Sequence, residues 1–183
     1  MPEKPALVET IVTTDMAKAI AKAYGVHLIE VLTGFKFIGE QIKWFEEQNT
    51  YHYVFGLEES YGCLAGTYAR DKDACVAVMM LCEVAAYCKS QGKTLWDAML
   101  DMYEKYGYYK EGLADLATGK TESTGLPNSN VLYYELSDGA WCCVRPSGTE
   151  PKIKFYFGVK GDSFESSKEQ LQELEDALMK KFK

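Results

Sequence analysis

The sequence predicts an α/β domain, with a mixed or parallel sheet and flanking helices, followed by a smaller α+β domain. Strand-like and helix-like segments alternate over the first half of the chain, which is typical of parallel sheets. Near the C-terminus, three strand-like segments precede one amphipathic helix, which favours a helix packed on an antiparallel sheet. A polar stretch from Thr118 to Asn130 has no apolar periodicity and lies between these two parts. We therefore expect domains over residues 1–112 and 113–183.

The first domain is expected to contain three short strands rich in β-branched and aromatic residues: Val8–Thr13, Val26–Leu32 and Tyr51–Phe55. Between them, apolar residues recur at three- and four-residue spacing, which predicts two helices. The first helix is capped by Thr14 or Asp15 and ends at Gly25, because glycine tolerates the left-handed conformation of a helix C-terminus. The second ends near Gln48.

The segment from Asp73 to Tyr87 is apolar nearly all round, which predicts a buried helix. A further helix is expected to begin at Thr94. The second domain is expected to contain three strands and a closing helix, in the order Val131–Leu136, Ala140–Val144, Ile153–Val159 and Phe164–Phe182.

Composition and charge argue against several classes of function. The 183 residues carry a formal net charge of −7, and no basic stripe is present that would bind a nucleic-acid backbone. None of the six cysteines belongs to a Cys-x-x-Cys pair, so we expect reduced thiols rather than disulfides or a zinc site. No apolar run reaches the length of a membrane span, and the first residues do not resemble a signal peptide. We expect a cytoplasmic protein that binds neither nucleic acid nor a membrane.

The segment Arg-Pro-Ser-Gly-Thr-Glu-Pro-Lys, which starts at Arg145, lies between two predicted strands and suits an anion. Arg145 can grip a phosphate through two parallel N–H bonds, and the hydroxyls of Ser147 and Thr149 can donate hydrogen bonds. Backbone N–H groups around Gly148 can form a concave nest. The alternative interpretation is an ordinary hairpin loop in which Gly and Pro form the turn.

Two other loops follow predicted strands of the first domain, at the strand ends where open α/β sheets bind ligands. One contains Glu58, Glu59 and Ser60, whose carboxylates and hydroxyl can bond sugar hydroxyls. A metal site would need more oxygen ligands than this loop offers, and a solvated acidic turn is the alternative. The other loop is Thr33-Gly34-Phe35-Lys36, which is weak evidence by itself.

The charged run Arg70-Asp71-Lys72-Asp73 precedes the predicted buried helix. Arg70 and Lys72 can reach a phosphate at the same edge, and Lys72 can assist proton transfer if it is desolvated. The alternative is a charged helix start, in which Asp71 and Asp73 interact favourably with the helix dipole.

Together these four loops resemble the α-D-phosphohexomutase family, which contains the phosphoglucomutases and phosphomannomutases. In that family a Thr-Gly-aromatic-Lys loop and a Glu-x-Ser loop of the third domain recognise sugar, and an Arg-x-Ser-Gly-Thr loop of the fourth domain binds phosphate. The matching positions here are Thr33, Gly34, Phe35 and Lys36, then Glu58 and Ser60, then Arg145, Ser147, Gly148 and Thr149. Lys72 matches the lysine of the family's Arg-x-Lys-Asp run, and Lys154 stands where many relatives have a second basic contact.

The resemblance implies an enzyme that interconverts hexose 1-phosphate and hexose 6-phosphate through a bisphosphate. The family's catalytic loop, a Ser-His-Asn-Pro-like motif, and its magnesium loop, Asp-x-Asp-x-Asp-Arg, are absent from this sequence. Both belong to the family's first two domains, so the resemblance implies that Mg²⁺ is bound outside this chain and that the N-terminal domains of a parent enzyme are its partners.

The isolated chain is expected to show no catalysis, and the resemblance implies that hexose phosphate or bisphosphate is the ligand of the parent enzyme. The join from Gly112 to Thr118 is shorter than in relatives, so the fourth domain is expected to be incomplete. A free-standing phosphosugar-binding module is the alternative function, and the loops do not distinguish glucose from mannose.

Overall fold

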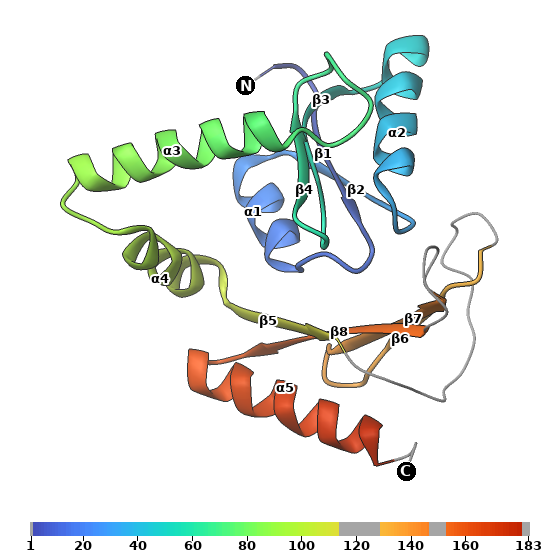
Figure 1. The fold of residues 1–183 in the computed structure, drawn as a ribbon, viewed down its shortest axis with the longest axis vertical. Helices are drawn as coiled ribbons and strands as arrows, with labels where there is room; N and C mark the ends of the chain where they lie inside the picture. Colours follow the sequence, from blue (N-terminus) through green and yellow to red (C-terminus); the bar gives the residue numbers. More distant parts are fainter. Residues whose placement is uncertain (1, 114–128, 147–152, 181–183) are drawn as a thin grey trace. The chain divides into compact units, whose positions relative to one another are not determined.

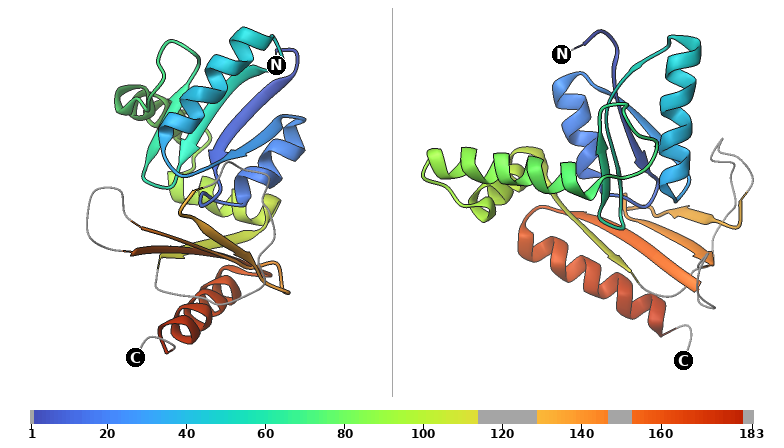
Figure 2. Two further views of the ribbon diagram at one scale, coloured as in Figure 1. Left: turned by 90° about the vertical axis from the view of Figure 1, so that its right-hand side faces the viewer. Right: turned by 45° about the horizontal axis from the view of Figure 1, so that its top comes forward.

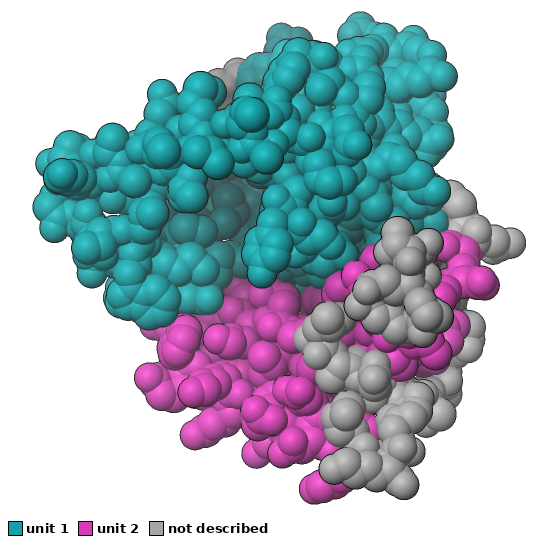
Figure 3. All heavy atoms as spheres, viewed as in Figure 1, with its two compact units in different colours: residues 1–106 teal, residues 107–183 magenta. Residues whose placement is uncertain are grey.

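The computed structural model describes residues 2–113, 129–146 and 153–180. They form two compact units that divide after Tyr106, and Figure 3 colours the two units separately. The sequence predicted a division after residue 112. In the structure the second unit begins earlier and includes β5 (Tyr108–Leu113), because this strand pairs with β8 of the second unit. Each unit is built around its own four-stranded sheet.

The sheet of the first unit has the strand order β2-β1-β3-β4. Its strands are β1 (Pro5–Thr10), β2 (His27–Val31), β3 (His52–Glu58) and β4 (Gly62–Ala65). The first three strands are parallel, whereas β4 is antiparallel to β3. Helices α1 (Met16–Tyr24) and α2 (Phe35–Gln48) cover opposite faces of the sheet (Figures 1 and 2). The predicted α/β architecture is confirmed.

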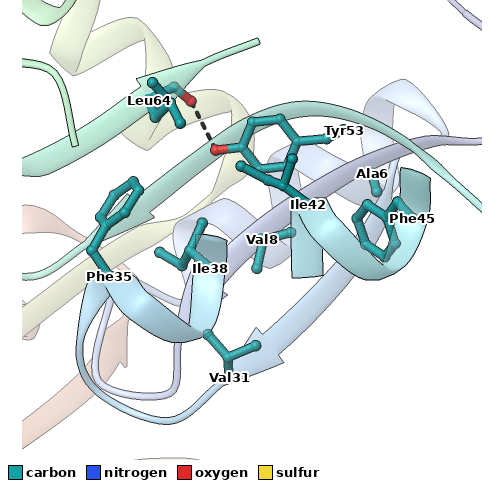
Figure 4. Close-up of a cluster of buried hydrophobic side chains, with 9 residues drawn as sticks. All are labelled: Ala6, Val8, Val31, Phe35, Ile38, Ile42, Phe45, Tyr53 and Leu64. Atoms are coloured by element: carbon teal, nitrogen blue, oxygen red, sulfur yellow. Dashed lines mark hydrogen bonds between the residues drawn. The ribbon is translucent and has the colours of Figure 1, made fainter. Parts of the chain in front are cut away.

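The core of the first unit lies between the sheet and α2 (Figure 4). Ile38 and Ile42 of α2 are fully buried against Val8 of β1. The hydroxyl of Tyr53 donates to the carbonyl oxygen of Leu64 at 3.0 Å, which satisfies a polar group inside the core. This core holds the β1 and β3 strands in place, and with them the loops that follow those strands.

Helix α3 (Ala74–Ser90) forms where a helix is predicted, but the prediction that it is buried is wrong. Cys88 is the only buried residue of α3, and Figures 1 and 2 show α3 extending away from the sheet. It continues into α4 (Leu95–Tyr106), which has no buried residue. The large apolar side chains that these helices expose are Val78, Met79, Leu81, Val84, Tyr87, Leu95, Trp96 and Leu100. An all-apolar helix needs a covering partner to become buried, and the described residues do not provide one for most of α3.

No single helix in the described part of the chain is both long and apolar enough to cross a membrane. Among the described helices, α3 and α4 taken as a pair, bent by 89° at their junction, have the length and composition of a broken span or a re-entrant loop.

The second unit is an antiparallel sheet with the strand order β5-β8-β7-β6. Strands β6 (Leu132–Glu135), β7 (Trp141–Pro146) and β8 (Ile153–Gly161) are followed by helix α5 (Phe164–Met179). The helix covers one face through Leu178, which packs with Cys142 and Phe157. The predicted α+β architecture is confirmed, and β5 is an additional strand.

Candidate functional site

Chemically active side chains of the first unit gather where its parallel strands end. Thr10 ends β1, Thr33 follows β2 by two residues, and Glu58 ends β3. Because these strands run parallel, their carboxyl ends lie at one edge of the sheet, which is the usual ligand-binding edge of open α/β sheets. The sequence-predicted Thr33–Lys36 and Glu58–Ser60 loops therefore share this edge.

A carboxylate and an ammonium group form an ion pair at this edge. The Nζ atom of Lys72 lies 3.4 Å from Oε1 of Glu58 and 5.7 Å from the ring centroid of Phe35. The Glu58 side chain is only 7% exposed, whereas that of Lys72 is 48% exposed. The carboxylate is thus held in a poorly solvated place while the cation faces water, where it can meet an anionic ligand.

The close approach of these two side chains depends on a glycine. A Cβ atom added to Gly62 would lie 2.7 Å from Oε1 of Glu58 and 2.7 Å from Cδ of Lys72. Gly62 pairs with Glu58 across the β3–β4 hairpin. The strand register therefore places residue 62 beside the ion pair, where a side chain would collide with it.

In the run of residues 70–73, neighbouring groups shift the pKa values of Lys72 and Asp71. Partial burial alone would lower the pKa of Lys72, but the nearby carboxylates of Glu58 and Asp71 outweigh it and raise that pKa. The backbone N–H of Lys72 donates to Asp71, and this bond is the main cause that lowers the pKa of the Asp71 carboxyl group. The raised pKa keeps Lys72 in its charged form at neutral pH.

One neighbour that sequence reasoning did not assign to the site, Thr10, contacts the Glu58–Ser60 loop. The hydroxyl of Thr10 donates to Oε2 of Glu59 at 3.2 Å, and the hydroxyl of Ser60 donates to Oε1 of the same carboxylate at 3.1 Å. The predicted strand Val8–Thr13 places Thr10 in its interior, whereas β1 ends at Thr10. A strand boundary placed correctly would have pointed to Thr10 as a residue of the edge.

The Thr33–Lys36 loop divides into structural and exposed positions. Gly34 precedes α2 with a φ of 115°, which favours glycine. Phe35 is 3% exposed and belongs to the core, and its ring packs beneath the ammonium group of Lys72. Lys36 is exposed, with its Nζ atom 4.8 Å from the ring centroid of Phe37.

Arg70 is engaged elsewhere than in the Glu58–Lys72 pair. Its guanidinium bonds Glu46 of α2 and the backbone carbonyls of Thr67 and Ala69. Glu46 lies near the C-terminal end of α2, whereas Phe35 begins this helix. Its role in substrate binding stays a prediction.

In the second unit, two cations stand side by side on one face of the sheet. Arg145 of β7 and Lys154 of β8 are direct cross-strand partners, and side chains of such partners share a face. The residues that face α5 on these strands, Cys142 and Phe157, lie at the alternate positions. Arg145 and Lys154 therefore occupy the face opposite α5.

Arg145 also contacts a neighbouring tyrosine on this face. Its Nη2 atom donates to the hydroxyl of Tyr156 at 3.0 Å. Three other predicted phosphate-binding residues, Ser147, Gly148 and Thr149, lie outside the described residues, between β7 and β8. Within the described ranges, no group of three or more His, Cys, Asp or Glu side chains is arranged to hold a metal ion.

Comparison with known proteins finds two family models, which match successive parts of the chain and overlap at residues 91–106. Residues 1–106 match the family model "Phosphoglucomutase/phosphomannomutase, alpha/beta/alpha domain III". Residues 91–181 match "Phosphoglucomutase/phosphomannomutase, C-terminal domain".

Two curated relatives are staphylococcal phosphoglucomutases. The protein of Staphylococcus haemolyticus is 29% identical over 210 residues, which cover 90% of this chain and 38% of the relative. The protein of Staphylococcus epidermidis is 32% identical over 203 residues, which cover 86% of this chain and 36% of the relative. The chain thus spans less than two fifths of the length of these relatives.

Two solved structures share the fold at low sequence identity. The open form of parafusin, a phosphoglucomutase from Paramecium, has a TM-score of 0.60 at 15% identity and covers 91% of this chain and 36% of its own. N-acetylphosphoglucosamine mutase of Aspergillus fumigatus, solved with glucose 1,6-bisphosphate, has a TM-score of 0.53 at 14% identity, with coverage of 96% and 39%. With both domain models matched over most of its length, this chain belongs to the phosphoglucomutase/phosphomannomutase family, of which it contains domain III and the C-terminal domain.

Proposed function

We propose that this chain is the sugar- and phosphate-binding part of an enzyme that interconverts hexose 1-phosphate and hexose 6-phosphate. Its relatives are phosphoglucomutases more than twice as long as the matched region. In this proposal the transfer step belongs to the rest of the enzyme, while this chain holds the hexose hydroxyls and the phosphate that is not being transferred.

The observation that carries the proposal is the direct cross-strand placement of Arg145 and Lys154. Like charges directly opposite each other on neighbouring strands destabilise a sheet. A bound phosphate removes this repulsion, because its negative charge is shared by both cations. Ser147, Gly148 and Thr149 follow Arg145 in sequence and supply further donors in this proposal.

The sugar part of the proposal rests on Glu58 and Ser60 at the edge of the first sheet. A carboxylate that is little exposed to water accepts hydrogen bonds from hydroxyl groups strongly, since few water molecules compete. Thr33, Gly34 and Lys36 follow the neighbouring strand and complete the sugar loop set in this proposal. Lys72, which stays charged, adds a positive group for a phosphate of the substrate.

Magnesium ions in phosphoryl-transfer enzymes neutralise charge on the transferring phosphate. The described residues offer no cluster of three or more acidic, histidine or cysteine side chains for such an ion. In this proposal, Mg²⁺ binding and the catalytic serine belong to parts of the parent enzyme outside this chain, because the sequence lacks the acidic metal loop and the serine loop of the family. The N-terminal domains of that enzyme are the partners of this chain in the proposal.

Titration of glucose 6-phosphate into the chain at low salt, followed by NMR shift perturbation, tests the proposal. Arg145→Ala is expected to weaken binding roughly 10- to 150-fold, because a hydrogen bond to a charged group contributes about 1.5–3 kcal/mol. Lys168→Ala, which removes an exposed charge from α5, is the matched control and is expected to change affinity little. Equal effects of the two substitutions would show attraction to overall charge and would refute a phosphate site at Arg145.

A further inference from the structure

Tyr156 touches the predicted phosphate-binding arginine in two ways. Its hydroxyl accepts a hydrogen bond from Nη2 of Arg145 at 3.0 Å. The Cζ atom of Arg145 also lies 5.6 Å from the centroid of the tyrosine ring, within the range of a cation–π contact. Both contacts join neighbouring strands, since Tyr156 lies on β8 and Arg145 on β7.

The tyrosine is a rigid support for the arginine. Tyr156 is 6% exposed, and its backbone is paired with Cys143 of β7 and Leu113 of β5 in the middle of the sheet. A buried ring on a central strand has few alternative rotamers. The guanidinium of an arginine is a flat fork of donors on a flexible stem, so one hydrogen bond to a fixed hydroxyl sets the direction of the whole fork.

We propose that Tyr156 is a positioning residue for phosphate binding: it orients the guanidinium of Arg145 before the ligand arrives. This inference rests on the proposed phosphate site at Arg145. Without the tyrosine hydroxyl, the arginine side chain must give up its rotational freedom when phosphate binds, and that loss weakens binding. Lys154, the other cation of the face, is the direct partner of Arg145 across the strands and supplies charge without a fork.

The substitution Tyr156→Phe separates the two contacts, because it removes the hydroxyl and keeps the ring. We expect it to weaken binding of inorganic phosphate by roughly three- to tenfold, which is the scale of ordering one flexible side chain on binding. Tyr156→Leu removes the ring contact as well and is expected to weaken binding further. Tyr134→Phe, a hydroxyl removal on β6 at a position that pairs with Cys142, is the matched control and is expected to leave affinity unchanged.

A double-mutant cycle separates positioning from a general effect on the fold. Inorganic phosphate is titrated into the parent chain, Tyr156→Phe, Arg145→Ala and the double variant, and thermal unfolding is recorded for each. We expect the tyrosine substitution to have no further effect when Arg145 is already absent. A loss of the same size in both backgrounds, or no loss in the parent background, would overturn the inference while leaving the phosphate site in place. If Arg145→Ala itself leaves phosphate affinity unchanged, the proposed phosphate site is refuted, and the role of Tyr156 with it.

Discussion

Lys72 and Glu58 form an ion pair of 3.4 Å at the carboxyl edge of the first sheet, and the pair exists beside a residue that has no side chain. Gly62 leaves the space that the two side chains occupy. The pair therefore depends on a position that carries no charge and no hydrogen-bonding side chain of its own.

Replacing Gly62 with alanine is expected to separate this ion pair without unfolding the unit. The atoms that a new Cβ would meet belong to the Glu58 and Lys72 side chains, which can move. We expect hexose phosphate to bind roughly three- to tenfold more weakly, on the scale of one lost polar contact, with a thermal midpoint close to that of the parent chain. Titration calorimetry beside a thermal melt measures both, and unchanged affinity would show that the pair has no part in binding.

The exposure of α3 predicts a contrast between two apolar substitutions. Leu81 of α3 is 56% exposed, whereas Ile38 of α2 is fully buried. Leu81→Lys is therefore expected to change the free energy of unfolding by no more than about 0.5 kcal/mol. Ile38→Ala is expected to lower it by about 2–5 kcal/mol, because it leaves a cavity in the core.

Urea denaturation of both variants measures these changes. A cost at Leu81 similar to that at Ile38 would mean that α3 is covered in solution, as its apolar sequence alone suggests.

The start of α3 is expected to loosen at low pH. The carboxylate of Asp73 accepts hydrogen bonds from the Tyr68 hydroxyl and from the backbone N–H groups of Cys75 and Val76. The hydrogen bond from Tyr68 is the main cause that lowers the pKa of the Asp73 carboxyl group below its ordinary value of 3.8. A group with a depressed folded-state pKa stabilises the fold above its unfolded pKa, and this contribution is lost as the pH falls through the folded value.

Protection of the Cys75 and Val76 amides against hydrogen exchange, after correction for the intrinsic exchange rate, is therefore expected to stay constant above pH 3.8 and to fall below it. In Asp73→Ala it is expected to be low throughout, because the cap is absent at every pH. A pH dependence that survives this substitution would assign the effect to another group.

The isolated chain is expected to show no conversion of glucose 1-phosphate to glucose 6-phosphate, even with Mg²⁺ and glucose 1,6-bisphosphate present. The sequence contains neither the serine loop nor the acidic metal loop of the family. A coupled enzymatic assay measures this. Turnover that persists through repurification and scales with the amount of this chain would contradict the expectation.

Most elements of the fold could be predicted from the sequence, since apolar periodicity and glycine punctuation mark them locally. Strand β4 has only four residues, and β5 has the sequence Tyr-Tyr-Lys-Glu-Gly-Leu, in which polar and apolar residues do not alternate clearly. Neither strand could therefore be predicted from hydrophobic alternation. The burial of α3 could not be predicted for a different reason. Composition shows how apolar a helix is, but not whether another part of the molecule covers it.

Within the candidate site, sequence reasoning could single out residues that lie in one short segment, such as Glu58 and Ser60, and their role in binding stays a prediction. Contacts between distant segments were not predictable. The bond from Thr10 to Glu59 joins residues 49 positions apart, and the bond from Arg70 to Glu46 joins residues 24 apart. Such pairs follow from strand order and helix packing, which a local pattern does not specify.

The central claim is that Glu58 binds the hydroxyl groups of the hexose and that Arg145 binds the phosphate. The most direct test titrates glucose 6-phosphate and inorganic phosphate separately into Glu58→Gln and Arg145→Ala at low salt. We expect Glu58→Gln to weaken binding of glucose 6-phosphate while inorganic phosphate binds nearly as before, and Arg145→Ala to weaken both ligands by more than about tenfold. If Arg145→Ala bound both ligands as well as the parent chain, or if Glu58→Gln weakened both equally, the proposed division between sugar and phosphate recognition would be contradicted.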